Sequence, residues 1–121
     1  MTHTILTVDD SRTMRDMLRM ALAGAGFNVI EAVDGEHGIE VLDIHRPDVI
    51  VTDINMPRLD GFGFIEKVRQ DRDHRATPIL VLTTESDPAK KDRARAAGAT
   101  GWIVKPFNPD KLVEAIRRVA A

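Results

Sequence analysis

Hydrophobic residues follow two alternating patterns along the chain. Short continuous runs of apolar residues, typical of strands buried on both faces, recur five times. Longer segments between them repeat apolar residues at helical spacing. The expected strands are Ile5–Val8, Asn28–Ala32, Val49–Asp53, Ile79–Leu82 and Thr100–Val104.

The helical segments begin at residues that cap helices. Ser11 and Asp34 can cap the first two, and Asp60 leads into the third. Asp87–Pro88 and Asn108–Pro109 place a capping side chain before a proline at the first helical position. The expected helices run from Ser11 to Gly24, Asp34 to about His45, Gly61 through at least Val68, Pro88 to about Ala97, and Pro109 to about Ala120.

Burial along these elements is also predicted. On the first helix the core face is expected to hold Met14, Met17, Leu18, Ala21 and Leu22, with Met20 in or near the core. The charged stretch Asp71–Arg75 is expected to be a solvated connection. The four histidines lack the spacing of metal ligands and are expected at the surface: His3, His37, His45 and His74.

Strict alternation of strands and helices predicts an α/β fold. We expect parallel strands with helices on both faces, in a single doubly wound (βα)5 domain over residues 1–121. We expect a flavodoxin-like strand order of 2-1-3-4-5.

Composition excludes several classes of protein. The chain has 121 residues, a net charge of −2 and no cysteine, so disulfides, thiolate chemistry and a global attraction to nucleic acid or membrane are not expected. The N-terminus lacks a basic segment and is not a signal peptide, and no run is long enough to span a membrane. A cytoplasmic protein of one domain is therefore the expected default. We also expect a monomer, and no output domain because the chain ends with the fifth predicted helix.

Polar residues gather where the predicted strands end. In the expected order, strands 1, 3, 4 and 5 bring Asp9, Asp10, Asp53, Thr83 and Lys105 to one sheet edge. Three carboxylates repel one another unless cations intervene, and Mg²⁺ prefers such oxygen ligands. The set therefore predicts a magnesium site suited to phosphoryl transfer onto Asp53, with the Asn55 carbonyl available to complete the shell.

Four motifs at these positions resemble the response-regulator receiver domain of two-component signalling, in particular stand-alone CheY-like chemotaxis regulators. They are Val8–Arg12 (VDDSR), Asp53–Pro57 (DINMP), Pro78–Glu85 (PILVLTTE) and Lys105–Phe107 (KPF). The motifs occur in order and at spacings that fill the domain, so the resemblance covers essentially the whole chain.

The resemblance implies specific roles. Asp53 would accept a phosphoryl group from the phosphohistidine of a kinase, and Thr83 and Lys105 would bind its oxygens. Asp9, Asp10, Asp53 and the Asn55 carbonyl would hold Mg²⁺, and the Lys105–Pro106 peptide bond would be cis.

The resemblance also implies how the signal leaves the domain. A target, such as a flagellar motor switch, would bind the face of helix 4, strand 5 and helix 5. Alternatively, the domain would serve as a phosphate sink, or as a receiver in a phosphorelay outside chemotaxis. Such a domain is a switch that modifies itself, not a turnover enzyme.

Several positions near the motifs refine the resemblance. Trp102 stands where the family usually has a tyrosine or phenylalanine that switches rotamer, and ordinary strand packing is the alternative for it. Thr84 replaces a usually very small residue, whereas Asn55 and Glu85 match regulators with short-lived phosphorylation. The basic residues of helix 4 suit either docking of an acidic peptide or simple solvation; they are Lys90, Lys91, Arg93 and Arg95.

Two other classes of protein share part of this pattern. Haloacid-dehalogenase-type phosphatases also use an aspartate nucleophile and magnesium, but place a second aspartate where this chain has Asn55. Flavodoxin-type binders share the fold, but the acids Asp9 and Asp10 would repel a phosphate group. The sequence disfavours both.

Overall fold

The computed structural model describes residues 2–120, which form five strands alternating with five helices. The strands are β1 (Thr4–Val8), β2 (Asn28–Ala32), β3 (Val49–Thr52), β4 (Ile79–Thr83) and β5 (Gly101–Val104). The helices are α1 (Arg12–Gly24), α2 (Gly35–Leu42), α3 (Gly61–Gln70), α4 (Pro88–Ala97) and α5 (Pro109–Ala120).

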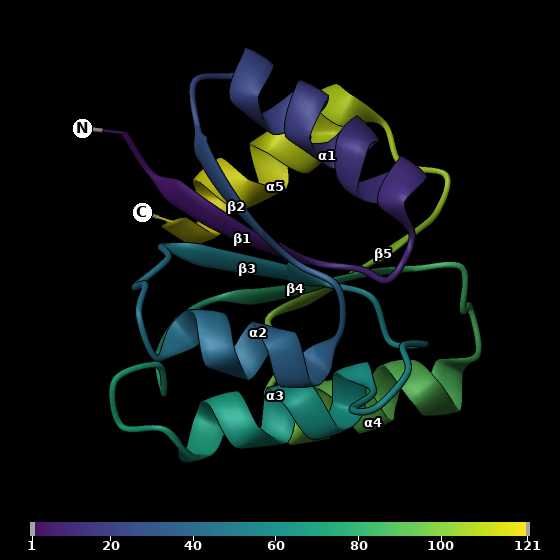
Figure 1. Ribbon diagram of the computed structural model, residues 1–121. Helices are drawn as coiled ribbons and strands as arrows, with labels where there is room; N and C mark the ends of the chain where they lie inside the picture. The colour runs from purple at the N-terminus through teal and green to yellow at the C-terminus, as the bar shows by residue number, and fades with distance from the viewer. Residues whose placement is uncertain (1, 121) are drawn as a thin grey trace.

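The strands form one parallel sheet in the order β2-β1-β3-β4-β5, which confirms the predicted fold. Helices α1 and α5 cover one face, and α2, α3 and α4 cover the other (Figure 1). The connection after β1 leads to β2, and the connection after β3 leads in the opposite direction along the sheet, to β4. The adjacent strands β1 and β3 therefore have connections that diverge. This is the switch point at which open α/β sheets bind ligands.

The central strands have apolar side chains on both faces because both faces are covered. Every residue of β3 and β4 is buried. Ile50, Ile79 and Val81 contribute to the cluster under α2, α3 and α4, whereas Val49 and Val51 contribute to the cluster under α1 and α5. The rigid sheet fixes the positions of the residues that follow each strand.

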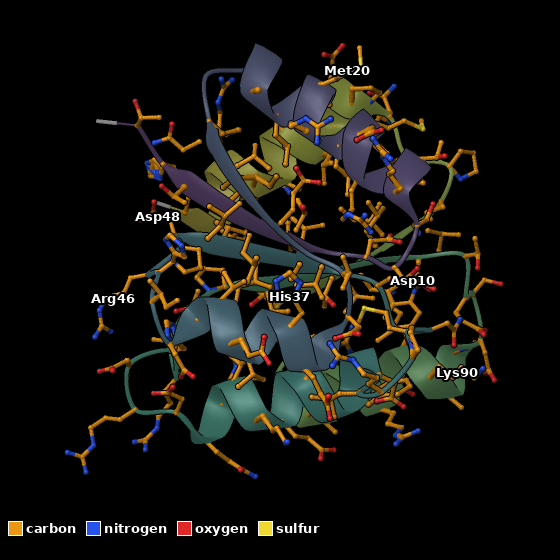
Figure 2. All side chains as sticks on the ribbon, in the orientation of Figure 1. Asp10, Met20, His37, Arg46, Asp48 and Lys90 are labelled. Atoms are coloured by element: carbon orange, nitrogen blue, oxygen red, sulfur yellow. The ribbon has the colours of Figure 1, made fainter. Side chains whose placement is uncertain are left out.

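Helix α1 buries a narrower stripe than the sequence predicts. Its N-cap is Ser11, as expected, and Leu18 and Leu22 are fully buried. The core prediction is wrong for two methionines: Met17 is 49% exposed and Met20 is 75% exposed, the latter pointing away from the body of the protein (Figure 2). One row of residues at i and i+4 is enough to seal α1 against the sheet, and the methionines lie beside that row.

The predicted capping residues cap their helices. Asp34 accepts a hydrogen bond from the backbone N–H of His37. Asp60, which the sequence placed only at the start of α3, also caps its helix by accepting a hydrogen bond from the backbone N–H of Gly63. Asp87 and Asn108 do the same for α4 and α5. Helix α2 ends at Leu42, three residues before the predicted His45, although turns continue the chain to that residue.

The stretch from Asp71 to Arg75 is not wholly solvated, and the surface prediction is wrong for His74. This side chain is 2% exposed, and its Nε2 lies 3.1 Å from the carbonyl oxygen of Leu42. The imidazole thereby joins the loop after α3 to the end of α2. His45 is exposed, as predicted.

Within residues 2–120, every helix is too short or too polar to cross a membrane.

Candidate functional site

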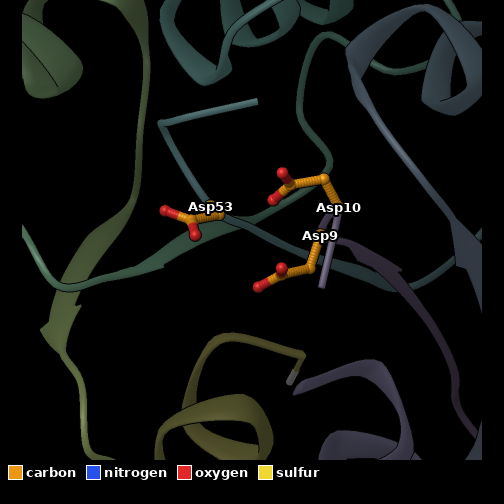
Figure 3. A group of neighbouring side chains, drawn as sticks. All are labelled: Asp9, Asp10 and Asp53. Atoms are coloured by element: carbon orange, nitrogen blue, oxygen red, sulfur yellow. The ribbon is translucent and has the colours of Figure 1, made fainter. Parts of the chain in front are cut away.

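Three carboxylates meet at the carboxyl edge of the sheet. Asp9 follows the last residue of β1 and Asp53 follows the last residue of β3; these strands pair through Val8 and Thr52. One carboxylate oxygen from each of Asp9, Asp10 and Asp53 lies within 4.8 Å of the others (Figure 3). The sheet therefore brings together the three acids that the sequence placed at this edge.

Lys105 binds two of these acids. It follows β5, and its Nζ lies 2.9 Å from Asp9 Oδ2 and 2.9 Å from Asp53 Oδ2. The exposed fractions are 10% for the Lys105 side chain, 3% for Asp9 and 12% for Asp53, so both ion pairs are largely shielded from water. A single ammonium leaves the three carboxylates under-compensated.

The pKa values of Asp9 and Lys105 reflect this imbalance. Burial raises the pKa of Asp9; hydrogen bonds from the Ser11 N–H and from Lys105 oppose that effect, and the charge of Asp53 adds to it. Burial alone would lower the pKa of Lys105, but the hydrogen bonds to Asp53 and Asp9 outweigh it, and the pKa is raised. The site consequently favours binding of a further cation.

Backbone groups and one arginine hold the two buried acids in place. Asp53 Oδ1 accepts a hydrogen bond of 2.6 Å from the backbone N–H of Ile54. Asp9 Oδ1 accepts one of 2.8 Å from that of Ser11, and the Asp9 carbonyl accepts one of 2.7 Å from Nη1 of Arg15. Sequence reasoning missed Arg15, because an arginine on an amphipathic helix looks like any exposed residue.

The donor set fits a hard divalent cation. Asp9, Asp10 and Asp53 offer carboxylate oxygens, the ligands that Mg²⁺ prefers, and Asp10 is solvent-exposed, which leaves room for water ligands. Asn55 is exposed and lies two residues beyond Asp53, in the loop that passes this edge of the sheet.

Thr83 ends β4, the strand next to β3. Its side chain is fully buried, and its hydroxyl accepts a 3.3 Å hydrogen bond from the backbone N–H of Glu85. Thr84 is exposed. The backbone N–H of Lys105 donates a 2.8 Å hydrogen bond to the Thr83 carbonyl. The end of β4 is thereby bonded to Lys105, whose side chain forms the ion pair with Asp53. The Lys105–Pro106 bond is cis.

Glu85 bridges the loops that follow β3 and β4. Its Oε1 accepts a 2.9 Å bond from Nζ of Lys90 and a 3.4 Å bond from Nδ2 of Asn55. These two bonds, the one from Lys90 first, lower the pKa of Glu85. Lys90 is thus engaged beside the site, a contact that its position in a basic helix did not indicate.

Trp102 lies away from the acidic cluster. It pairs with Val81 in the sheet, whereas Thr83 pairs with Val104, two residues further along. The indole is half-buried and packs against the core under α4. It lines a small hollow with Lys91 and Arg95.

The other basic residues of α4 divide into two groups. Arg93 stacks on Phe62, with 4.0 Å between the guanidinium carbon and the ring centroid. Lys91 and Arg95 border the hollow beside Trp102. Two of the four basic side chains of α4 are therefore engaged by neighbours, and two flank the indole.

Residues 5–117 match the model of the response regulator receiver domain. The chain is 38% identical over 119 residues to the chemotaxis protein CheY1 of Helicobacter pylori, covering 95% of this chain and 94% of that protein. It is also 38% identical over 115 residues to the probable transcriptional regulator ycf27 of Guillardia theta, but spans only 44% of that protein's length.

The fold matches solved structures equally closely. The chemotaxis protein CheY4 of Vibrio cholerae superimposes with a TM-score of 0.94 and 44% identity, covering 98% of this chain and 99% of that one. The receiver domain of the sensor histidine kinase PA1611 from Pseudomonas aeruginosa, solved with a magnesium ion in its active-site cleft, gives a TM-score of 0.92 and 25% identity, covering 99% and 98%.

Proposed function

Because the chain belongs to the response regulator receiver domain family, we propose that it is a signalling switch activated by phosphorylation of Asp53. The observation that carries this proposal is the set of contacts around Asp53. A carboxylate that is 12% exposed is paired with Lys105 and lies beside two further acids. It stands at the carboxyl edge of the sheet, where open α/β sheets bind ligands.

Receiver domains bind Mg²⁺ at an acidic pocket. In this chain we assign Asp9, Asp10, Asp53 and the Asn55 carbonyl as its protein ligands. When bound, the ion supplies positive charge that offsets the acids and the incoming phosphoryl oxygens. The crystal structure of the PA1611 receiver domain, which has a magnesium ion coordinated in its active-site cleft, supports this assignment.

Proteins of this family work with histidine kinases, and we propose a kinase phosphohistidine as the donor. An Asp53 carboxylate oxygen forms the new bond to phosphorus as the bond between phosphorus and the imidazole nitrogen breaks. Lys105 then shifts its hydrogen bond from the Asp53 carboxylate to an oxygen of the phosphoryl group. The Thr83 hydroxyl turns to donate to a second phosphoryl oxygen. Positioning and charge neutralisation carry most of the catalysis in such a transfer.

Hydrolysis of the phosphorylated aspartate ends the signal. We assign the tuning of its rate to Asn55, Thr84 and Glu85, which surround the approach to Asp53. The bonds from Asn55 and Lys90 to Glu85 orient that carboxylate. Thr84 is exposed and directly follows Thr83; we propose that its side chain partly obstructs the same approach.

The output we propose is docking of a target protein on the face formed by α4, β5 and α5, with Thr83 and Trp102 as the switch residues. The close match to CheY proteins over nearly their full length favours a role in chemotaxis, either at a flagellar motor or as a phosphate sink. A receiver in a phosphorelay outside chemotaxis is the second candidate, because the chain also matches part of ycf27, a probable transcriptional regulator.

Phosphorylation by acetyl phosphate in the presence of Mg²⁺ tests the central residue. Wild type should take up one phosphoryl group, and Asp53→Asn should take up none while its circular dichroism spectrum stays unchanged. Asp43→Asn is the matched control, because Asp43 is an exposed aspartate at the end of α2, and it should label like wild type. Equal labelling of Asp53→Asn and wild type would exclude Asp53 as the acceptor.

A further inference from the structure

One residue in the loop after β3 has an unusual backbone conformation. Arg58 has φ +66°, and it is the one non-glycine residue with positive φ among residues 2–120. A residue with a Cβ is strained in this region, so neighbouring contacts must hold it there.

Arg58 is held by a bidentate ion pair with Asp34. Arg58 Nε lies 2.7 Å from Asp34 Oδ2, and Arg58 Nη2 lies 2.9 Å from Asp34 Oδ1. The Asp34 side chain is only 6% exposed, and the hydrogen bond from Arg58 is the main cause of its lowered pKa. Nη1 of Arg58 also pairs with Glu36 at 3.2 Å. Such bidentate geometry fixes orientation as well as distance.

A backbone contact joins the same two segments. The Gly35 N–H donates to the Leu59 carbonyl at 3.2 Å, and a Cβ at Gly35 would overlap that carbonyl oxygen. The residues after Arg58 and Asp34 are therefore also in direct contact. The N-terminus of α2 anchors the loop at two consecutive positions.

The anchored loop is the one that carries Asn55. It leaves the sheet at Asp53 and closes on itself through the bond from the Gly61 N–H to the Ile54 carbonyl, at 2.8 Å. Ile54 is 2% exposed and packs in the core, and Arg58 is held by Asp34, so Asn55 lies between two anchored positions of the loop. The position of Arg58 thereby limits the position of the Asn55 backbone.

We propose that the Arg58–Asp34 ion pair is a positioning contact that holds the loop at residues 54–60 in the conformation needed for Mg²⁺ binding by the Asn55 carbonyl. The inference rests on the magnesium site described under the proposed function. It assigns a role in metal affinity to two residues that do not themselves bind the ion. It also explains why a strained arginine stands where glycine would be unstrained.

Mg²⁺ affinity, measured by titration calorimetry on the unphosphorylated full chain, tests the inference. Loss of residues that orient metal ligands typically weakens binding 10–100-fold; because Arg58 acts through a loop, we expect Arg58→Ala to weaken it by about fivefold to tenfold. Asp34→Asn keeps an oxygen to cap α2 but loses the charge, and it should weaken Mg²⁺ binding similarly. The double variant should be no weaker than either single variant, because all three lack the same contact.

Two further variants separate positioning from general destabilisation. Arg58→Gly removes the ion pair but relieves the backbone strain, so it should fold well and still lose Mg²⁺ affinity. Arg46→Ala removes another arginine–aspartate pair, formed with Asp73 at 3.2 Å and far from the acidic cluster (Figure 2). This control should bind Mg²⁺ within twofold of wild type.

The outcomes distinguish this inference from the proposed function. If wild type binds no Mg²⁺, or Asp10→Asn binds it as tightly as wild type, the metal site itself is wrong. If Asp10→Asn loses Mg²⁺ while Arg58→Gly and Arg58→Ala keep wild-type affinity, the site stands and the positioning role is overturned. Losses that multiply in the double variant would also overturn it.

Discussion

The loops that follow β3 and β4 are joined beside Asp53 by the hydrogen bond from Asn55 to Glu85, but different kinds of contact hold them in place. The loop after β3, residues 54–60, buries Ile54 and Met56 and is held by the Arg58–Asp34 pair. The segment after β4, residues 84–87, contains no apolar residue. Its contacts at the site are the 3.3 Å hydrogen bond from the Glu85 N–H to the Thr83 hydroxyl and the hydrogen bonds that the Glu85 carboxylate accepts from Asn55 and Lys90.

This difference assigns the two loops different tasks. A loop with buried anchors keeps metal ligands in fixed positions, which metal affinity requires. A loop held by a few polar bonds at the surface rearranges at small free-energy cost, as a segment that reports phosphorylation must. We therefore expect the β3 side of the site to stay fixed on activation and the β4 side to move.

The largest effect should come from removing one of the proposed metal ligands. Mg²⁺ at 100 times its dissociation constant should stabilise wild type by about 2.7 kcal/mol, which raises Tm by roughly 10 °C for a chain of this size. Asp10→Asn should lose most of this shift in differential scanning calorimetry. Asp16→Asn, which changes an acid on α1 whose side chain is 44% exposed, should keep it. Equal shifts in wild type and Asp10→Asn would remove Asp10 from the metal site.

Removing the hydroxyl that links the movable loop to the phosphoryl group should separate phosphorylation from output. Allosteric coupling commonly changes affinity about 5–150-fold. Thr83→Ala should accept the phosphoryl group yet gain less than about twofold in affinity for its target, measured by pull-down with and without beryllofluoride. Thr84→Ala changes the exposed neighbouring threonine and should retain the full gain. A normal gain in Thr83→Ala would place the switch elsewhere.

The sequence predicted the sheet and the acidic cluster because both depend on patterns along the chain. Continuous apolar runs identified β3 and β4, and the strand order then required Asp9 and Asp53 to be neighbours. Contacts between distant side chains have no such pattern. The Arg58–Asp34 pair spans 24 positions and the bond from His74 to Leu42 spans 32, so both arise only once the elements are packed.

Helix α1 illustrates a further limit of sequence patterns. Met17 and Leu18 are both apolar and adjacent, and hydrophobicity alone assigns both to the core. The direction of the helix relative to the sheet decides between them, and only Leu18 is buried. The Lys90–Glu85 bond escaped prediction similarly, because it depends on where α4 begins relative to the end of β4.

A smaller effect should appear at Trp102, the only tryptophan in the chain. If the movable side draws Thr83 toward Asp53, the space beside the half-buried indole changes, although the ring N–H limits full burial because it needs a partner. Beryllofluoride with Mg²⁺ should change the fluorescence of Trp102 or its quenching by acrylamide, and Thr83→Ala should reduce the change. A constant signal, with binding at Asp53 shown independently, would identify Trp102 as packing only.

The smallest effect concerns acid stability of the fixed side. Arg58 lowers the pKa of Asp34 below its ordinary value of 3.8, so the folded state binds fewer protons there than the unfolded state. This contribution to stability is complete above the ordinary pKa and is lost as pH falls through the lowered value. Urea unfolding between pH 7 and pH 2.5 should show a shallower loss for Asp34→Asn than for wild type. Parallel curves would mean that the pair makes no pH-dependent contribution to stability.

The most direct test of the account is to locate the phosphoryl group. Wild type is labelled with acetyl phosphate and Mg²⁺, digested and analysed by peptide mass spectrometry, with a sample in excess chelator as the control. The account predicts one phosphoryl group per chain, on Asp53, and none when Mg²⁺ is removed. A phosphoryl group on any other residue, or equal labelling without Mg²⁺, would contradict it.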